Sequence, residues 1–199
     1  MALSASGCAV GGAAAPAPAP SREAKATPSS SSSPALVAAR AGAVVPEQPV
    51  SIELPDGDLV PIRSVGTTAN GLLDVPSDIG EAGWWSGGSR IGDPFGSTLV
   101  AAHVDSTTQG LGPFASLLTV RAGDRVVVWS EGLRQGFRVK SLWLRPRGTI
   151  GDGSWLHSPD GDRRLVLVTC AGPYDAARGG YQNLAVIVAE PQGKAVPRT

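Results

Sequence analysis

Cys170 and His103 are the two residues of this sequence that are best suited to covalent catalysis. Cys170 ends the apolar run 165–169 and His103 ends the run 98–102, so each side chain stands where a buried strand is expected to give way to a loop. The thiolate is the nucleophilic form of cysteine, and at pH 7 only about 3% of a thiol with the ordinary pKa of about 8.5 is ionised. A histidine or an arginine beside the sulfur would therefore be needed to favour the charged form.

Both residues also have a structural interpretation. Free cysteine is among the most buried residue types and usually packs as a small hydrophobe. A lone histidine is more often a core or surface residue than a catalyst. A catalytic pair requires the two strands to be parallel neighbours, because only then do the thiol and the imidazole open at the same end of the sheet. The two residues alone leave both interpretations open.

The strands that must position this pair are short and evenly spaced. Apolar and β-branched residues, bounded by Gly, Pro and Asn-Gly signals, predict strands over 50–55, 59–66, 72–76, 97–105, 124–130, 135–144, 165–170 and 183–189. We expect the strand before Cys170 to stop there, since the Ala-Gly-Pro that follows cannot continue a ladder. Helix is predicted only as short turns, at 76–83 and 111–119. Seven or eight such strands favour an all-β fold with a closed β-barrel, because closure removes exposed edges.

The chain divides by composition into three parts. Residues 1–49 are rich in Ala, Pro and Ser and lack aromatic side chains, so they cannot bury enough apolar surface to offset the entropy of ordering, and we expect a disordered export tether. Residues 50–191 predict one domain with one core, and 192–199 predict a C-terminal tail. Within the domain, the Gly-rich loop 145–162 has a length that is usually functional.

Charge, hydropathy and cysteine content restrict the possible functions. The chain has 17 basic and 17 acidic residues and no basic patch interleaved with aromatics, which disfavours nucleic acid as a partner. No run of 18 apolar residues predicts a transmembrane helix. Cys8 follows small residues, as in the end of a lipoprotein signal, and is a lipidation candidate, although no basic region and apolar core precede it. We predict no disulfide, no cofactor and no metal cluster, while a calcium site on loop carboxylates stays open.

Three parts of the domain resemble the sortases, and most closely those of class F. Residues 166–170 resemble the Thr-Leu-x-Thr-Cys signature of that family, with Val in place of the first Thr. Residues 98–105 resemble the strand that carries the catalytic histidine, which an aspartate usually follows within two residues. The segments 83–85 and 170–175 are similar to class F members. The resemblance covers about 50–191, the whole expected domain.

The resemblance implies a cysteine transpeptidase on a sortase-like barrel. Cys170 would attack a backbone carbonyl in a C-terminal sorting motif, commonly of the Leu-Pro-x-Thr-Gly type, of an exported protein. His103 would act as general acid toward the leaving amine and then as general base toward an amine acceptor of the cell wall or surface. Such an enzyme would be a monomer outside the cytoplasm, at a Gram-positive cell surface, with the membrane involved only through an N-terminal anchor.

The third catalytic residue departs from the family pattern. In the family an arginine near the start of the last strand would hold the substrate and stabilise the oxyanion, but Gln182 stands near that place. Arg178 is the only arginine in the preceding loop and is our candidate, with a solvated loop residue as the alternative. Thr169 could shape the pocket or simply fit the strand, and Asp105 could orient His103 or bond the loop.

Two other functions remain open at this point. One is a non-catalytic, wall-associated β-barrel that binds peptide or glycan, in which Cys170 is buried and unreactive. The other is a cysteine hydrolase that uses the same site, in which water resolves the thioester in place of an amine.

Overall fold

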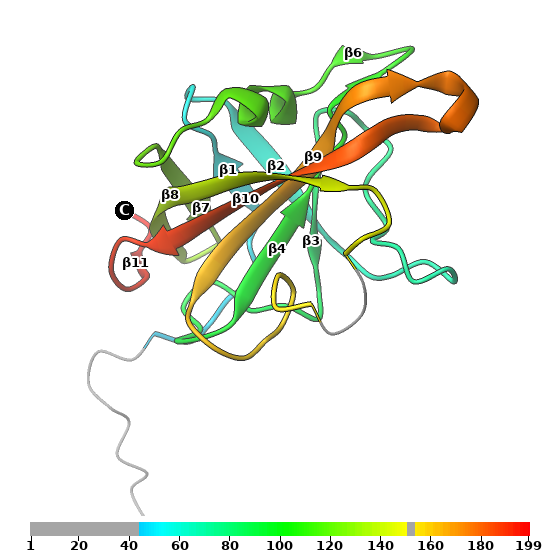
Figure 1. The fold of residues 1–199 in the computed structure, drawn as a ribbon. Coiled ribbons are helices and arrows are strands. Elements are labelled where there is room, and N and C mark those ends of the chain that lie inside the picture. Colours follow the sequence, from blue (N-terminus) through cyan, green and yellow to red (C-terminus); the bar gives the residue numbers. More distant parts are fainter. Residues whose placement is uncertain (1–43, 151–153) are drawn as a thin grey trace, which may run out of the picture. The chain divides into compact units, whose positions relative to one another are not determined.

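The described part of the chain is a closed β-barrel. The computed structural model describes residues 44–150 and 154–199. Eight strands follow one another around the barrel in the order β10-β9-β4-β3-β2-β1-β7-β8, and β8 pairs back to β10 (Figure 1). Their bounds are β1 Ser51–Glu53, β2 Leu59–Val65, β3 Ala82–Trp85, β4 Ser97–Ala101, β7 Arg125–Trp129, β8 Leu133–Pro146, β9 Arg164–Asp175 and β10 Gly180–Pro191. The prediction of an all-β fold with a closed seven- or eight-stranded barrel is confirmed.

Short elements complete the described fold. β5 and β6, of two residues each, form a small hairpin after β4, and the 3₁₀ helix η1 precedes β7. A second 3₁₀ turn, η2, joins β9 to β10, and β11 pairs with β8. Their bounds are β5 Asp105–Ser106, β6 Gly110–Leu111, η1 Pro113–Thr119, η2 Ala176–Arg178 and β11 Val196–Pro197. The helical turn predicted at 111–119 is thus confirmed as η1, which buries Phe114 and Leu117 in the barrel core.

β9 is buried on both faces, as its apolar run predicted. Leu165 and Leu167 point into the main core, which fills the barrel. Val166 lies in a second apolar cluster with Val186 of β10, and Leu156 of the loop before β9 belongs to this cluster. Because successive residues of a strand face opposite sides, a strand covered on both faces needs a continuous apolar run rather than alternation.

The strand predicted at 72–76 is wrong, because these residues contribute only an isolated bridge between Thr67 and Leu73. The helical turn predicted at 76–83 is a single non-helical turn at 79–80, closed by a bond from the Glu81 amide to the Asp78 carbonyl. The chain instead enters β3, in which Gly83 has no room for a side chain, because a Cβ there would overlap Val65. The requirement for this glycine is a tertiary contact, so strand propensity could not reveal β3.

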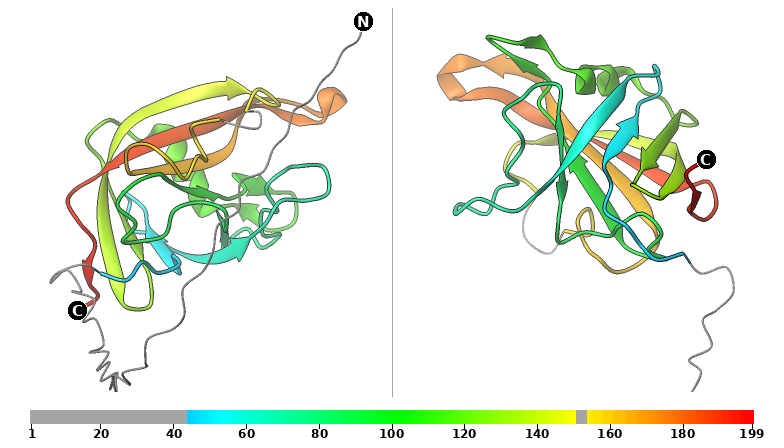
Figure 2. Two further views of the ribbon diagram at one scale, coloured as in Figure 1. Left: turned by 90° about the horizontal axis from the view of Figure 1, so that it is seen from below. Right: turned by 180° about the vertical axis from the view of Figure 1, so that it is seen from behind.

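β9 does not stop at Cys170. It continues through Gly172 and Pro173, which are joined by a cis peptide bond, and pairs again with β10 at Tyr174 opposite Tyr181. The register shifts at this point, so Pro173 stands at an irregularity where no ladder bond is required of it. The two strands therefore form a long hairpin whose far end projects beyond the barrel (orange in Figure 1 and Figure 2).

Some residues on either side of 50–191 also bond to the barrel. Glu47, within the expected tether, pairs with Ile91 through backbone bonds, and its carboxylate accepts bonds at 2.7 Å from the Ser130 hydroxyl and from the Gly132 amide. β11, within the expected tail, joins the sheet. The remainder of the predicted tether, 1–43 with Cys8, lies outside the described residues. In the described ranges, no helix has the length and hydropathy needed to cross a bilayer.

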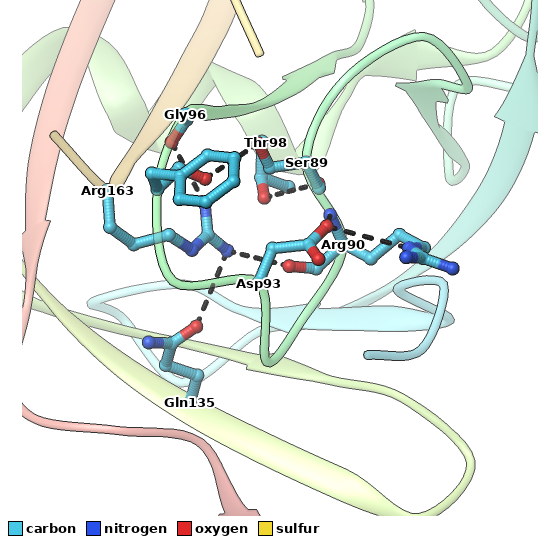
Figure 3. A network of polar contacts seen from close by, with 8 residues as sticks. Ser89, Arg90, Asp93, Gly96, Thr98, Gln135 and Arg163 are labelled. Carbon is cyan, nitrogen blue, oxygen red and sulfur yellow. Dashed lines mark hydrogen bonds and ion pairs between the residues drawn. The ribbon is translucent and has the colours of Figure 1, made fainter. Parts of the chain in front are cut away.

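A buried arginine ties together the end of the barrel where β4 and β9 begin. Arg163 is only 8% exposed and donates to the carbonyl oxygens of Gly96 and Arg90 and to the side chain of Gln135 (Figure 3). Its guanidinium also lies 5.3 Å from the centre of the Phe137 ring. Burial lowers the pKa of Arg163 to about 10, and the surrounding acceptors allow the charge to stay inside the protein.

Candidate active site

β4 and β9 bring His103 and Cys170 to the same end of the barrel. The two strands are parallel neighbours, with Ala101 opposite Val168, and the Ala102 amide donates to the Val168 carbonyl at 3.2 Å. The β4–β9 ladder ends at this pair, and the same register continued for two residues would bring the exposed His103 level with the half-buried Cys170. The arrangement that a catalytic pair requires, with adjacent strands running in the same direction, is therefore present in the structure.

Cys170 opens onto a cavity of about 370 Å³. The cavity wall is mostly apolar and comes from β4, β9, β10 and the loops that follow β2 and β8. Its apolar residues include Leu72, Leu73, Val75, Leu99, Ile150 and Leu184. The titratable groups on this wall, within the described ranges, are Cys170, Arg147 and His157. Such a cavity suits an extended, largely apolar peptide segment whose reacting carbonyl reaches the sulfur.

The Trp pair that was noted in the sequence divides between core and cavity. Trp84 is buried in the barrel core. Trp85 faces the cavity, where its ring meets that of His157 edge-on, with centroids 5.4 Å apart and an interplanar angle of 79°. This contact joins β3 to the loop before β9 and forms one wall beside Cys170.

The surroundings of Cys170 favour the thiol in the resting protein. Burial raises the pKa of Cys170 above its ordinary value, the charge of Arg147 lowers it, and that of Asp105 raises it further. The side chain is only half-buried, so a substrate can still reach the sulfur. Catalysis at neutral pH therefore needs a neighbouring base or cation that becomes effective when the substrate is bound.

Arg147 is the functional candidate that sequence reasoning missed. It directly follows β8, and its amide donates to the Gln182 carbonyl at 2.9 Å, while its guanidinium donates to the Gly179 carbonyl at 3.0 Å. These bonds fix Arg147 between β8 and the β9–β10 hairpin. Arg147 lines the cavity, and its charge lowers the pKa of Cys170. The only signal for it in the sequence was the length of the loop 145–162.

Arg178 lies elsewhere. It ends η2, at the far end of the hairpin, and its side chain is 71% exposed. Its guanidinium is bonded to the Asp175 carboxylate at 2.7 Å, and that bond is the main cause that lowers the pKa of Asp175. Arg178 is not among the described residues that line the cavity, whereas Arg147 is.

The supporting candidates are also dispersed. Gln182 donates its side-chain amide to the Gly180 carbonyl at 2.6 Å within its own strand. Thr169 is 2% exposed and, being next to Cys170 on a strand, points to the opposite face, away from the cavity. Asp105 accepts a hydrogen bond from the Tyr181 hydroxyl at 2.5 Å, which agrees with the interpretation that it bonds neighbouring structure.

The described residues offer no site for a resident metal ion. Across 44–150 and 154–199, no three side chains of His, Cys, Asp or Glu gather closely enough to hold one.

Comparisons with known proteins agree with this fold. A family profile described as "Sortase domain" matches residues 52–192. No curated protein matches the sequence. Among solved structures, the SrtA sortase from Actinomyces oris is 20% identical with a TM-score of 0.56, and the match covers 78% of this chain and 85% of that one.

Two further solved structures are similar to the same degree. Sortase A from Listeria monocytogenes is 17% identical with a TM-score of 0.55, over 78% of this chain and 92% of that one. Sortase E1 from Streptomyces coelicolor, with a tripeptide in its active site, is 17% identical with a TM-score of 0.57, over 76% and 91%. At these identities the structural likeness shows the fold alone, while the profile covers more than half of the chain. The protein belongs to the sortase family.

Proposed function

We propose that this protein is a cysteine transpeptidase that cleaves a C-terminal sorting motif of exported proteins and joins them to an amine at the cell wall or surface. The observation that supports the proposal is the parallel pairing of β4 with β9, which directs His103 and Cys170 toward the same end of the barrel, where Cys170 opens onto an apolar cavity. A motif of the Leu-Pro-x-Thr-Gly type suits this cavity, because its first residues are apolar and extended.

The reaction proceeds in two acyl transfers. The Cys170 thiolate attacks the carbonyl carbon of the scissile peptide bond, and the carbon–nitrogen bond breaks as His103 gives a proton to the leaving amine. The product is a thioester on Cys170. An incoming amine then attacks the thioester while His103 takes its proton, so a new amide bond forms and the thiolate is released.

A guanidinium is needed to stabilise the charge that develops on the substrate oxygen. The effect of Arg147 on the pKa of Cys170, together with its place on the cavity wall, supports Arg147 in this role. Arg178 keeps the role only if it leaves Asp175 and the hairpin end moves toward the sulfur.

Arg147→Gln and Arg178→Gln form a matched pair that assigns the role. We expect Arg147→Gln to lower kcat/KM about 10²-fold and to raise the pKa of Cys170, measured from the pH dependence of thiol alkylation. Arg178→Gln should change both quantities far less. The reverse order of effects would assign the guanidinium to Arg178.

Several finer points belong to the same proposal. The segments 83–85 and 170–175 support a class F enzyme. The Ala-, Pro- and Ser-rich composition of 1–49 supports an extracytoplasmic enzyme tethered at the cell surface, with Cys8 as a candidate lipidation site. Exported proteins with a sorting motif and an amine acceptor would be its partners, and the enzyme would act as a monomer.

The decisive experiment is incubation with a library of peptides that carry varied sorting motifs, followed by mass spectrometry. We expect an acyl adduct on Cys170, absent from Cys170→Ala, that converts to an amide product when an amine is added. A product that is hydrolysed regardless of added amine would identify a cysteine hydrolase. The absence of any adduct, with a thiol unreactive toward alkylation, would support a non-catalytic barrel.

A further inference from the structure

The end of the β9–β10 hairpin is held in place by side chains as well as by the sheet. Between Cys170 and the hairpin end the ladder is irregular, because the register shifts between Tyr181 and Asn183. Beyond this shift the hairpin projects past the barrel on the side of β5 and β6 (Figure 1 and Figure 2). The local disruption of the ladder leaves room for contacts with other elements to help determine where the hairpin end lies.

One such contact links the hairpin to the segment that carries His103. The Tyr181 hydroxyl donates to the Asp105 carboxylate at 2.5 Å, across 76 residues of sequence. The bond is charge-assisted, which makes it shorter and stronger than a bond between neutral groups. The Tyr181 ring is in turn steadied by Tyr174 of β9, with centroids 5.1 Å apart and an interplanar angle of 78°.

Asp105 is coupled to His103 through a short and well-anchored backbone. His103 lies between Ala102 and Val104, which are both 4% exposed. The Val104 carbonyl accepts a bond from the Gly112 amide at 2.9 Å, and a Cβ on Gly112 would overlap the His103 carbonyl. Asp105 directly follows this anchored stretch, so its position is linked to that of His103, two residues before it.

We propose that Tyr181 is a positioning residue, which uses its bond to Asp105 to hold the His103 segment in place relative to Cys170 on β9. The inference rests on the proposed function, because the pair is worth aligning only if it catalyses acyl transfer. The bond is suited to this purpose across the working pH range. Its donation to Asp105 is the main cause that raises the pKa of Tyr181 to about 12, so the hydroxyl keeps its proton.

The test compares variants that remove the Tyr181–Asp105 bond, variants that retain it, and a control that leaves both residues unchanged. Tyr181→Phe removes the donor, and we expect kcat for acyl transfer to fall about tenfold or more with KM nearly unchanged, since a small misplacement of catalytic groups slows the chemical step. Asp105→Ala should also lower kcat, by an amount that includes the loss of its charge near Cys170, and adding Tyr181→Phe to Asp105→Ala should cause no further fall. Asp105→Asn retains an acceptor oxygen and should recover most of the rate.

Tyr174→Phe is the matched control. It removes a hydroxyl from the neighbouring ring, preserves the ring pair, and should keep kcat within about twofold of wild type. The thermal midpoints of all variants should lie close together, because Tyr181 and Asp105 are largely outside the core. A merely structural clamp would lower stability and leave kcat of the folded fraction unchanged, which would overturn the proposal.

The outcomes separate this proposal from the proposed function. If wild-type protein forms the Cys170 adduct and Tyr181→Phe matches it in kcat, the positioning role is wrong and the transpeptidase stands. Additive losses in the Tyr181 and Asp105 variants would also overturn the role, because two residues that act through one bond cannot contribute independently. If the wild-type protein forms no adduct, the proposed function itself is wrong and the positioning role falls with it.

Discussion

Gly96 is the position at which a single methyl group should damage this fold most clearly. Its φ is +78°, in the left-handed region, and it immediately precedes β4. Its amide donates to the Gly161 carbonyl at 2.9 Å, and its carbonyl accepts from the Arg164 amide at 2.9 Å. These bonds set where β4 and β9 begin. A Cβ built on Gly96 would lie far inside van der Waals contact with the Pro159 carbonyl and the Ser89 hydroxyl.

The cost of Gly96→Ala has two parts. A non-glycine residue in the left-handed region costs about 1–2 kcal/mol. The overlap with the backbone of Pro159 forces a shift in a packed region, and overpacking of this kind costs about 1–3 kcal/mol. The sum is about 2–5 kcal/mol, which is a large share of the roughly 5–15 kcal/mol that stabilises a domain. At about 2–4 °C per kcal/mol, the thermal midpoint should fall by about 5–20 °C.

Gly57→Ala separates the two parts. Gly57 has a φ of +96°, but a Cβ there would meet nothing within 4 Å. This variant should therefore lose only the backbone part, about 1–2 kcal/mol. Urea denaturation of wild type and both variants gives the free energy of unfolding directly. Equal losses in the two variants, or a loss below about 1 kcal/mol for Gly96→Ala, would refute the steric reasoning.

Three further predictions concern the cavity and the anchors of the fold. Leu72→Ala should lower kcat/KM for an apolar sorting peptide about fivefold, whereas Leu59→Ala, equally exposed but outside the cavity, should not; peptide cleavage assays compare them. A hydrogen bond from Ser130 is the main cause that holds the pKa of Glu47 below its usual 4.5. The ionised Glu47 carboxylate therefore contributes its full share of stability above pH 4.5, and this share is lost as the pH falls through the lower pKa of the folded protein. Urea titrations at neutral and acid pH should therefore show Glu47→Gln less stable than wild type only at the higher pH. Arg163→Met should cost about 2–4 kcal/mol in urea denaturation, because it removes a buried guanidinium that donates to two backbone carbonyls and to the Gln135 side chain, and an unchanged midpoint would contradict this account.

The local sequence was sufficient where an element depends on its own residues. The run 165–169 predicts a strand covered on both faces, and the structure buries it between two apolar clusters. The local sequence was insufficient where a contact with a residue distant in the chain determines the structure. Gly83 has low strand propensity but is required in β3 by the approach of Val65, and Pro173 reads as a strand end but lies at a register shift that tolerates it.

The candidate site shows the same division. The sequence by itself determined that Cys170 and His103 each come directly after a buried apolar run, because residue type and burial pattern depend on neighbours a few positions away. Only the tertiary structure decided that their strands are parallel neighbours and that Arg147, rather than Arg178, lies at the cavity. Contacts between distant residues depend on which strands pair and in what register, and that choice is made by burying the whole core at once when the barrel closes.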